Sequence, residues 1–446
     1  MSLAGAFRAR QFVRQSLWVV PLLGGVAGVA LSGVDLWVEG LINLPPSWSY
    51  SAATANSVLS AAAAAMVGLI GFVVTIGVLV VQMATGTLSP RFMRLWYRDR
   101  LQKFVLAAFT ATFTFAFALL RHVEADSVPD LGVSLVGLAV SIDLVLLLLY
   151  FDRFVHALRP VAVAAAMAEA GLAIEAEAGL AIEAEAGLAI EAEEDGLVAS
   201  AGNDDQGAGL GEPDARILAP RSGAIQDVDI ADLVRFAAAR GQVCVIPHTI
   251  GDFVTAGSVL MEVHGAASET DLRRLRGMVS LGHERTIDQD PAFALRIMVD
   301  IAIRALSPAV NDPTTATQVL NHIDDLLLGI GSSDRAFRGT ALDADGQVRL
   351  VVRTRSWSEY LDIGVTEIRQ YGAASPQICR RLRAMLEDLR DGVPLARRAV
   401  VQSQLDALDR ATDAAFADPV ERALARMSDR QGLGATRSGE TSDARG

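Results

Sequence analysis

The sequence predicts an α-helical multi-pass membrane protein with four transmembrane helices, followed by a mainly helical α+β cytosolic domain that contains a small β-barrel-like module. Three observations lead to this fold class. The 446-residue chain is 51% hydrophobic with a mean hydropathy of +0.34, which is too apolar for one soluble domain. The apolar excess lies in the first third of the chain. Residues 1–160 carry 11 Lys/Arg and 8 Asp/Glu, whereas the remainder carries 28 and 44, so a basic membrane domain precedes an acidic soluble one.

Four apolar runs within the first 160 residues are long enough to cross a bilayer. They cover residues 17–34, 58–88, 104–120 and 131–151. Arginines precede the first run and follow the second and the fourth. Because basic residues stay on the cytoplasmic side, we expect four spans in the inner (plasma) membrane, with both termini in the cytoplasm.

The second run carries a seam of small and polar residues at alternating steps of three and four, which includes Gly68, Gly71, Thr75 and Gln82. In hydrocarbon no hydrophobic force drives helices together, so small residues mark a face where backbones approach closely. The seam is therefore either a packing face or the border of a water-lined path, and both interpretations stay open. The first run has a similar packing face with small residues at four-residue spacing: Gly24, Gly28 and Ser32.

Asp143 lies inside the fourth run, on the order of 12 Å from its basic end at the helical rise of about 1.5 Å per residue. A carboxylate near the bilayer midplane costs several kcal/mol unless it is protonated, paired or hydrated. Asp143 is therefore either a functional group of the membrane domain or a protonated aspartate that hydrogen-bonds to a serine or threonine of a neighbouring span.

Residues 161–214 form the expected spacer between the two domains. Residues 168–191 are three copies of the octapeptide AEAGLAIE. An eight-residue period advances about 80° beyond two helical turns, so Leu172, Leu180 and Leu188 spiral around the helix and form no single stripe. The repeat therefore predicts a solvated, partly helical segment, and the Gly-rich residues after it predict a flexible linker.

The soluble part divides into a small β-rich module at 215–265, a mainly helical domain with one hairpin at 266–427, and a disordered tail at 428–446. The turn that begins GDFV at Gly251 is similar to the hammerhead turns of lipoyl and biotinyl carrier domains. The modified lysine is absent, since Lys103 is the only lysine in the chain. That absence also excludes a P-loop lysine and a Schiff-base lysine from the soluble part.

Two Asp-Pro pairs, Asp290-Pro291 and Asp312-Pro313, predict the starts of two helices joined by a short turn, with aspartate as the N-cap. A helix N-terminus with a guanidinium nearby suits an anion. The candidate anion or ligand site comprises Arg296, Asp300, Arg304, Asn311, Asp312, Thr314 and Thr315. The alternative is structural: Asp300 bridges both arginines, and Asp312 only caps its helix.

Several classes of function are disfavoured. The acidic soluble part repels phosphate backbones, so we expect no nucleic-acid partner. Cys244 and Cys379 are the only cysteines, which suits a reducing compartment. The six histidines are scattered, with no pair at zinc-ligand spacing. We therefore expect no metal and no cofactor, and we expect no enzymatic activity because no nucleophile–base pair can be named.

Four stretches carry a resemblance to a known family. They are LSPRFMRLWYRDRLQKFVLAAFTATF (88–113), GDFVTAGSVL (251–260), RTIDQDPAFALRIMVDIAIRALSPAVNDPTTA (285–316) and EIRQY (367–371). Apart from the octapeptide repeat, the chain resembles the family of predicted bacterial membrane proteins of unknown function catalogued as DUF 2254. The resemblance implies four spans plus a cytoplasmic domain and transfers no activity. Gln82 and Ser89-Pro90-Arg91 match the pattern of this family, whereas Asp143 has no place in it.

These features predict a membrane protein that works as an oligomeric conduit for an ion or small solute, regulated by its cytosolic domain. The expected partners are the lipid bilayer, further copies of the chain and a small anionic ligand. The alternative is a membrane-anchored sensor or scaffold whose cytosolic domain binds an anionic ligand or a protein partner.

Overall fold

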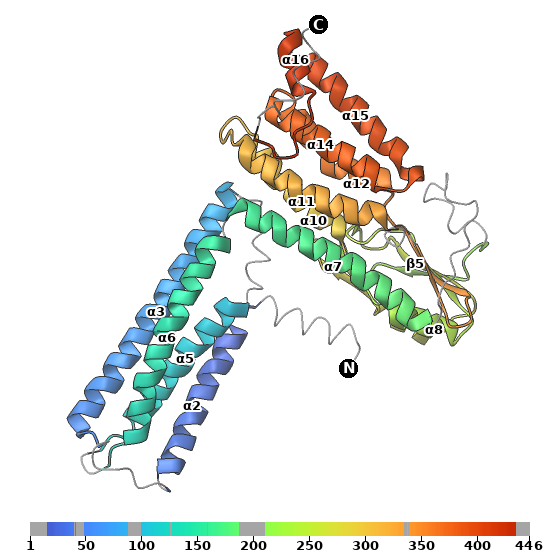
Figure 1. The fold of residues 1–446 in the computed structure, drawn as a ribbon. Coiled ribbons are helices and arrows are strands. Elements are labelled where there is room, and N and C mark those ends of the chain that lie inside the picture. The colour runs from blue at the N-terminus through green and yellow to red at the C-terminus, as the bar shows by residue number, and fades with distance from the viewer. Residues whose placement is uncertain are drawn as a thin grey trace. The chain divides into compact units, whose positions relative to one another are not determined.

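The computed structural model describes residues 16–39, 41, 49–87, 100–124, 127–157, 159–186, 210–333, 337 and 339–433. The chain forms two compact units, a membrane unit, Ala6–Arg159, and a C-terminal unit that contains Pro160–Gly446. Figure 1 colours the chain from blue at the N-terminus to red at the C-terminus and labels many of the helices and strand β5.

Four helices of the membrane unit are long and apolar enough to cross a bilayer. They are α2 (Val19–Glu39), α3 (Ala52–Thr87), α5 (Arg100–Leu120) and α6 (Asp130–Ala157). The structure thus confirms the four predicted apolar helices, although α3 begins earlier than the apolar run.

The predicted small-residue face of α2 packs against α5. A Cβ at Gly24 would overlap the carbonyl oxygen of Ala107, and a Cβ at Gly28 would overlap that of Ala111. The hydroxyl of Thr114 donates to the carbonyl oxygen of Gly25 at 2.9 Å, which ties the two backbones together. Glycine is therefore needed on α2 because the α5 backbone occupies the space of a side chain.

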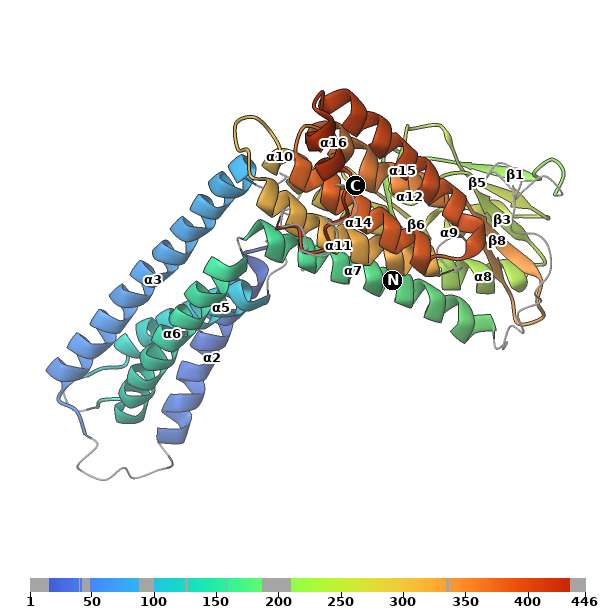
Figure 2. The ribbon, with the colours of Figure 1, turned by 45° about the horizontal axis from the view of Figure 1, so that its top comes forward.

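Helix α7 (Pro160–Ala186) of the C-terminal unit contains the first two octapeptide copies. Along its first half Val163, Ala164, Met167 and Ala168 are buried. Helix α7 packs against α10 (Pro291–Ala305) and α11 (Pro313–Ser332). Figures 1 and 2 both show α7, in green, alongside α11.

This packing corrects the expectation of a solvated spacer for residues 161–176. The apolar pattern drifts over three copies, but the residues buried along 163–171 span only about two and a half turns. Over that length they form one face, in which Gly171 lies against Leu326 of α11. The side chains of residues 177–186 and the whole of 187–209 lie outside the described residues.

Two sheets follow α7. The five-stranded sheet has the order β1 (Ala215–Leu218), β5 (Val259–His264), β3 (Val243–Ile246), β8 (Val348–Val352) and β7 (Thr340–Leu342). Its β3–β8 pair is parallel, and its other pairs are antiparallel. The three-stranded sheet has the order β4 (Phe253–Val254), β2 (Gly223–Val228) and β6 (Val279–Gly282). Two short helices, α8 (Ile230–Ala238) and α9 (Glu269–Arg276), connect strands.

The expected β-barrel-like module is not supported. In the part of the chain that the structure describes, the strands form two open sheets, and neither sheet closes on itself. The strands after residue 265 explain the difference, because β8 pairs with β3 and β6 pairs with β2. Each sheet therefore draws strands from both sides of the expected boundary at residue 265.

Helix α10 is the central helix of this unit, since most of its residues are buried. Asp290 accepts a hydrogen bond from the Phe293 amide at 3.1 Å, and Asp312 accepts one from the Thr315 amide at 3.0 Å, as the Asp-Pro pairs predict. The remaining helices are α12 (Trp357–Leu361), the π-helical turn η4 (Asp362–Thr366), α13 (Glu367–Gly372), α14 (Pro376–Gly392), α15 (Leu395–Ala415) and α16 (Pro419–Ala425).

The beginning of the expected disordered tail is packed. Asp429 is buried and accepts hydrogen bonds from the amides of Gln431 and Gly432, both at 3.0 Å. The Gln377 side chain donates to the carbonyl oxygen of Gly432 at 2.5 Å. Residues 434–446 lie outside the described residues.

Candidate functional site

The predicted seam of α3 is not covered by the rest of the described chain. A Cβ at Gly68 or Gly71 would meet no atom within 4 Å. Thr75 is exposed and donates its hydroxyl to the Gly71 carbonyl at 2.8 Å, within the same helix. Gln82 is exposed as well. The seam is thus not a packing face for any other described part of the chain.

Asp143 lies apart from this exposed face. Asp143 is only 2% exposed, and its side chain hydrogen-bonds to Thr112 of α5. Its Oδ2 has no hydrogen-bond partner among the described residues. This arrangement matches the structural alternative, an aspartate that hydrogen-bonds to a threonine of a neighbouring span.

The predicted anion site on the α10–α11 hairpin holds internal pairs. The Arg296 guanidinium donates to Asp300 Oδ1 at 2.7 Å and forms two bonds to Glu367, at 2.5 and 2.8 Å. These bonds, led by the one to Glu367, raise the pKa of Arg296. The sequence did not identify Glu367, because this partner lies on α13, far along the chain.

At the start of α11, Asp312 acts as a cap. Its carboxylate accepts hydrogen bonds from the Thr315 hydroxyl at 2.6 Å and from the Thr315 amide, which lower the pKa of Asp312. Asn311 adopts a positive φ of 49° and is exposed, as is Thr314, whereas Arg304 is half-buried on α10. Anion binding at this hairpin stays a prediction, and the bonds of Arg296 and Asp312 match the structural alternative.

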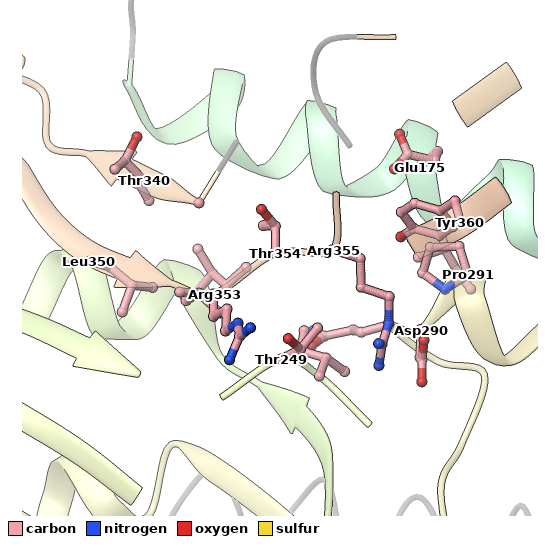
Figure 3. A pocket seen from close by; sticks show the side chains of 17 residues that line it. Glu175, Thr249, Asp290, Pro291, Thr340, Leu350, Arg353, Thr354, Arg355 and Tyr360 are labelled. Carbon is pink, nitrogen blue, oxygen red and sulfur yellow. The ribbon is translucent and has the colours of Figure 1, made fainter. Parts of the chain in front are cut away.

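A cavity of about 140 Å³ lies elsewhere in the C-terminal unit, and the sequence analysis did not predict it. Figure 3 shows the side chains that line it. The lining comes from α7, the start of α8, the loop after β3, the start of α10, the β7–β8 pair with the segment after β8, and α12: Ile174, Glu175, Ile230, Thr249, Ile250, Gln289, Asp290, Pro291, Gly339, Thr340, Ala341, Leu350, Val352, Arg353, Thr354, Arg355 and Tyr360.

Two arginines reach the cavity from the segment that follows β8. Arg353 and Arg355 are two residues apart on extended chain, and such residues project to the same side. The Arg353 amide donates to the Ile246 carbonyl at 3.2 Å, which extends the β3–β8 pairing. Between them, Thr354 donates its hydroxyl to the Phe337 carbonyl at 3.3 Å. The sheet thus fixes the position from which both guanidinium groups project (Figure 3).

Asp290 lies in the acidic part of the wall, but other groups compensate its charge. Its side chain is 3% exposed, and Oδ2 accepts two bonds from Arg285, at 3.1 and 2.7 Å. Burial raises the pKa of Asp290, while Arg285 and Arg355 act in the opposite direction. Gly251 lies against the same carboxylate, where a Cβ would overlap Oδ2, and its φ of +93° also requires glycine. The GDFV turn therefore packs directly against the Asp290 carboxylate through Gly251.

Tyr360 completes this side of the cavity. Its residue is 5% exposed. Burial raises the pKa of Tyr360, and the nearby carboxylates Asp290 and Glu175 raise it further. The phenol therefore stays protonated and can donate a hydrogen bond. Figure 3 shows Tyr360 beside Glu175 and Pro291.

The arginines keep donors that no described residue uses. Arg355 Nη2 lies 3.6 Å from Asp252 Oδ1, and its Nε is buried without a hydrogen-bond partner among the described residues. The Arg353 side chain is exposed, and no described side chain pairs with it. In the described part of the chain no group of three or more His, Cys, Asp or Glu residues could hold a metal ion.

Four apolar helices together with a mixed α/β unit define a membrane protein with a large extramembrane part. The chain belongs to the family described as "Predicted membrane protein (DUF2254)", whose model matches residues 14–388. It is 30% identical over 431 residues to "Uncharacterized protein MT1328" of Mycobacterium tuberculosis (strain CDC 1551 / Oshkosh), covering 93% of this chain and 79% of that protein. The same values hold for "Uncharacterized protein Mb1321c" of Mycobacterium bovis. No solved structure matches the chain significantly.

Proposed function

We propose that this membrane protein is a ligand-responsive sensor. The cavity of the C-terminal unit binds a small molecule on the cytoplasmic side of the inner membrane, and helix α7 transmits its occupancy to the spans. The proposal includes no catalytic step. It develops the sensor alternative of the sequence analysis and moves the ligand site from the α10–α11 hairpin to the cavity.

One observation carries the proposal. Ile174 and Glu175 of α7 line the cavity, and α7 begins at Pro160, directly after span α6 ends at Ala157. A ligand in the cavity therefore contacts the helix that continues the fourth span along the chain. Helices transmit displacement over their length because the backbone hydrogen bonds hold successive turns together.

The contacts of α7 with α11 favour a discrete docked state. Gly171 lies against Leu326, and Leu172 lies against Gly329. Such close packing is not continuously deformable, so a helix held in this way is either docked or displaced. A ligand can shift this equilibrium only by as much as its affinities for the two states differ. A ligand that contacts Ile174 and Glu175 binds the docked state more tightly than the displaced state, because these contacts exist only when α7 is docked.

The test uses the full-length protein in lipid nanodiscs. Thr249→Cys places a thiol in the cavity wall, and a small maleimide then occupies the cavity covalently. The native Cys244 and Cys379 are buried, and burial raises the pKa of Cys244 to about 11, so both react slowly. The control is Ser403→Cys on the exposed face of α15.

We expect labelling at residue 249, but not at residue 403, to change amide hydrogen exchange in residues 160–176 and in the last turns of α6. Unchanged exchange in a fully labelled Thr249→Cys protein would show that α7 does not respond to the cavity.

A conduit is the second candidate, and the exposed seam of α3 supports it. No described residue lies within 4 Å of a Cβ at Gly68 or Gly71, so further copies of the chain can face one another there. If the seam borders a path in an oligomer, Gly71→Leu blocks flux through reconstituted liposomes, whereas Leu79→Ala leaves flux unchanged. A Gly71→Leu oligomer that assembles and conducts normally would exclude this path.

A further inference from the structure

We infer that the ligand of the cavity is a small organic monoanion with an apolar body, and that Arg353 and Arg355 bind its charged group. This inference rests on the proposed function, because it uses the same cavity. It goes beyond that function by assigning the chemical class of the ligand and the residues that select it.

The charged side chains of the cavity wall differ in how far the protein itself pairs them. Four residues of the lining carry charge, two acids and two arginines. The two bonds from Arg285 and the Phe293 amide already use the Asp290 carboxylate. Glu175 also has an interaction within the chain, although its buried Oε2 has no hydrogen-bond partner among the described residues. The Asp290 carboxylate is thus engaged by the protein itself, and a cationic ligand would have to displace its partners there.

The two arginines differ from Asp290, although Arg355 Nη2 lies 3.6 Å from Asp252 Oδ1. Arg353 has no side-chain partner among the described residues, and Arg355 keeps its buried Nε unpaired there. An unpaired buried donor costs free energy, and a carboxylate or similar acceptor recovers it. Guanidinium groups present several N–H donors in a planar fork that suits such anions. The unused donors of the cavity therefore select a negative group.

The apolar part of the lining determines what the uncharged part of the ligand must be. Aliphatic side chains from several elements cover the other walls: Ile174, Ile230, Ile250, Leu350 and Val352. An inorganic anion would leave these walls without a partner, whereas an apolar body of matching size buries them. Glu175 and Asp290 lie near enough to disfavour a second negative charge. The best fit is thus a monoanion such as a short-chain or aromatic carboxylate.

Three probes of one shape test this assignment on the full-length protein in nanodiscs: benzoate, benzamide and benzylammonium. Binding is measured by calorimetry and by the shift of the thermal unfolding midpoint. We expect benzoate to bind more tightly than either other probe, and inorganic phosphate to bind more weakly than benzoate. Arg353→Gln should weaken benzoate binding at least about tenfold, as the loss of a charge-assisted hydrogen bond does. The control is Arg276→Gln, an exposed arginine of α9.

A second measurement decides the question if benzoate itself binds too weakly. The Thr249→Cys protein is treated with two methanethiosulfonate reagents, one carrying a sulfonate and one carrying a trimethylammonium group. We expect the ratio of the sulfonate rate to the ammonium rate to be higher for Thr249→Cys than for the exposed Ser403→Cys, and Arg353→Gln to reduce it. A ratio at residue 249 no higher than at residue 403, or one that Arg353→Gln leaves unchanged, overturns the inference.

The outcomes separate the inference from the proposed function. Anion selectivity that depends on Arg353, without any change in α7 exchange on labelling, leaves the ligand class standing and removes the sensor role. A change in α7 exchange without anion selectivity supports the sensor role and removes this ligand class.

Discussion

Leu172 of α7 lies directly over Gly329 of α11, so close that a Cβ on Gly329 would overlap Cδ2 of the leucine. The reverse arrangement occurs one residue earlier on α7, where Leu326 of α11 covers Gly171. Each helix thus supplies one leucine and one glycine to the contact. This exchange fixes both the rotation and the register of α7 on α11, since a shift of either helix brings leucine onto leucine.

We expect Gly329→Val to destabilise the C-terminal unit by about 1–3 kcal/mol, which is typical when a side chain is forced into packed space. Chemical denaturation of the purified full-length protein measures the change. Ala173→Val is the control, because Ala173 is exposed on α7. Equal stability of both variants would mean that α7 is not held against α11.

The repeat offers a second test of the same contact. Deletion of residues 176–191 removes two octapeptide copies and leaves one intact copy at 168–175. We expect this variant to unfold at nearly the same temperature as the parent protein. Deletion of 168–191 also removes Gly171 and Leu172, so its unfolding midpoint should fall clearly below that of the parent. Equal midpoints for the two deletions would contradict the packing of α7.

Asp227 of β2 makes stability depend on pH. Burial raises its pKa to about 6, and the nearby carboxylates Asp229 and Asp288 contribute. Its value in the unfolded chain is the ordinary 3.8, so the stabilising contribution is complete below that pH and is lost as the pH rises through about 6. We expect Asp227→Asn to stabilise the protein at pH 8 by about 1 kcal/mol, allowing for partial solvation. At pH 4 the substitution should have little effect, and a gain there as large as at pH 8 would contradict this account.

The bond between Asp143 and Thr112 gives a prediction within the membrane unit. Thr112→Val removes the threonine hydroxyl and leaves the aspartate without this partner. We expect a loss of about 0.5–2 kcal/mol, the usual range for a hydrogen bond between membrane helices. Thr112→Ser retains the hydroxyl and should behave like the parent protein. Unfolding in mixed detergent micelles measures both variants.

Membrane topology can be tested on whole cells with single cysteines. Ser127, between α5 and α6, and Ser222, before β2, are both exposed. If the positive-inside rule places the termini correctly, an impermeant thiol reagent labels Ser127→Cys in intact cells and labels Ser222→Cys only after permeabilisation. The opposite pattern would reverse the proposed orientation.

Local signals predicted the parts of the fold that depend on neighbouring residues. The four apolar helices, the aspartate caps of α10 and α11 and the glycine face of α2 all follow from spacing along one segment. The partners of these segments depend on tertiary pairing, which the sequence pattern does not contain. Glu367 pairs with Arg296 only because η4 and α13 fold back on α10, and this partner was missed.

The cavity was missed for the same reason. Arg353 and Arg355 follow an ordinary strand, and their position depends on the parallel pairing of β8 with β3. Glu175 belongs to a repeat whose three copies have identical sequences, and nothing local marks the copy that supplies a residue to the cavity. A partial signal existed at Asp290 and Gly251, both of which lie in stretches that carry the family resemblance.

Because the three octapeptide copies have the same sequence, changes in the number of copies in the gene have a predictable effect on the protein. Tandem repeats gain and lose whole units when DNA is copied out of register, and here every such event leaves the same AEAGLAIE directly after Met167. Helix α7 therefore supplies the same residues to the cavity whatever the number of repeat units, as long as one unit remains. Only the length of chain between that unit and β1 changes, so this segment can drift in length over generations while its first eight residues keep the same contacts.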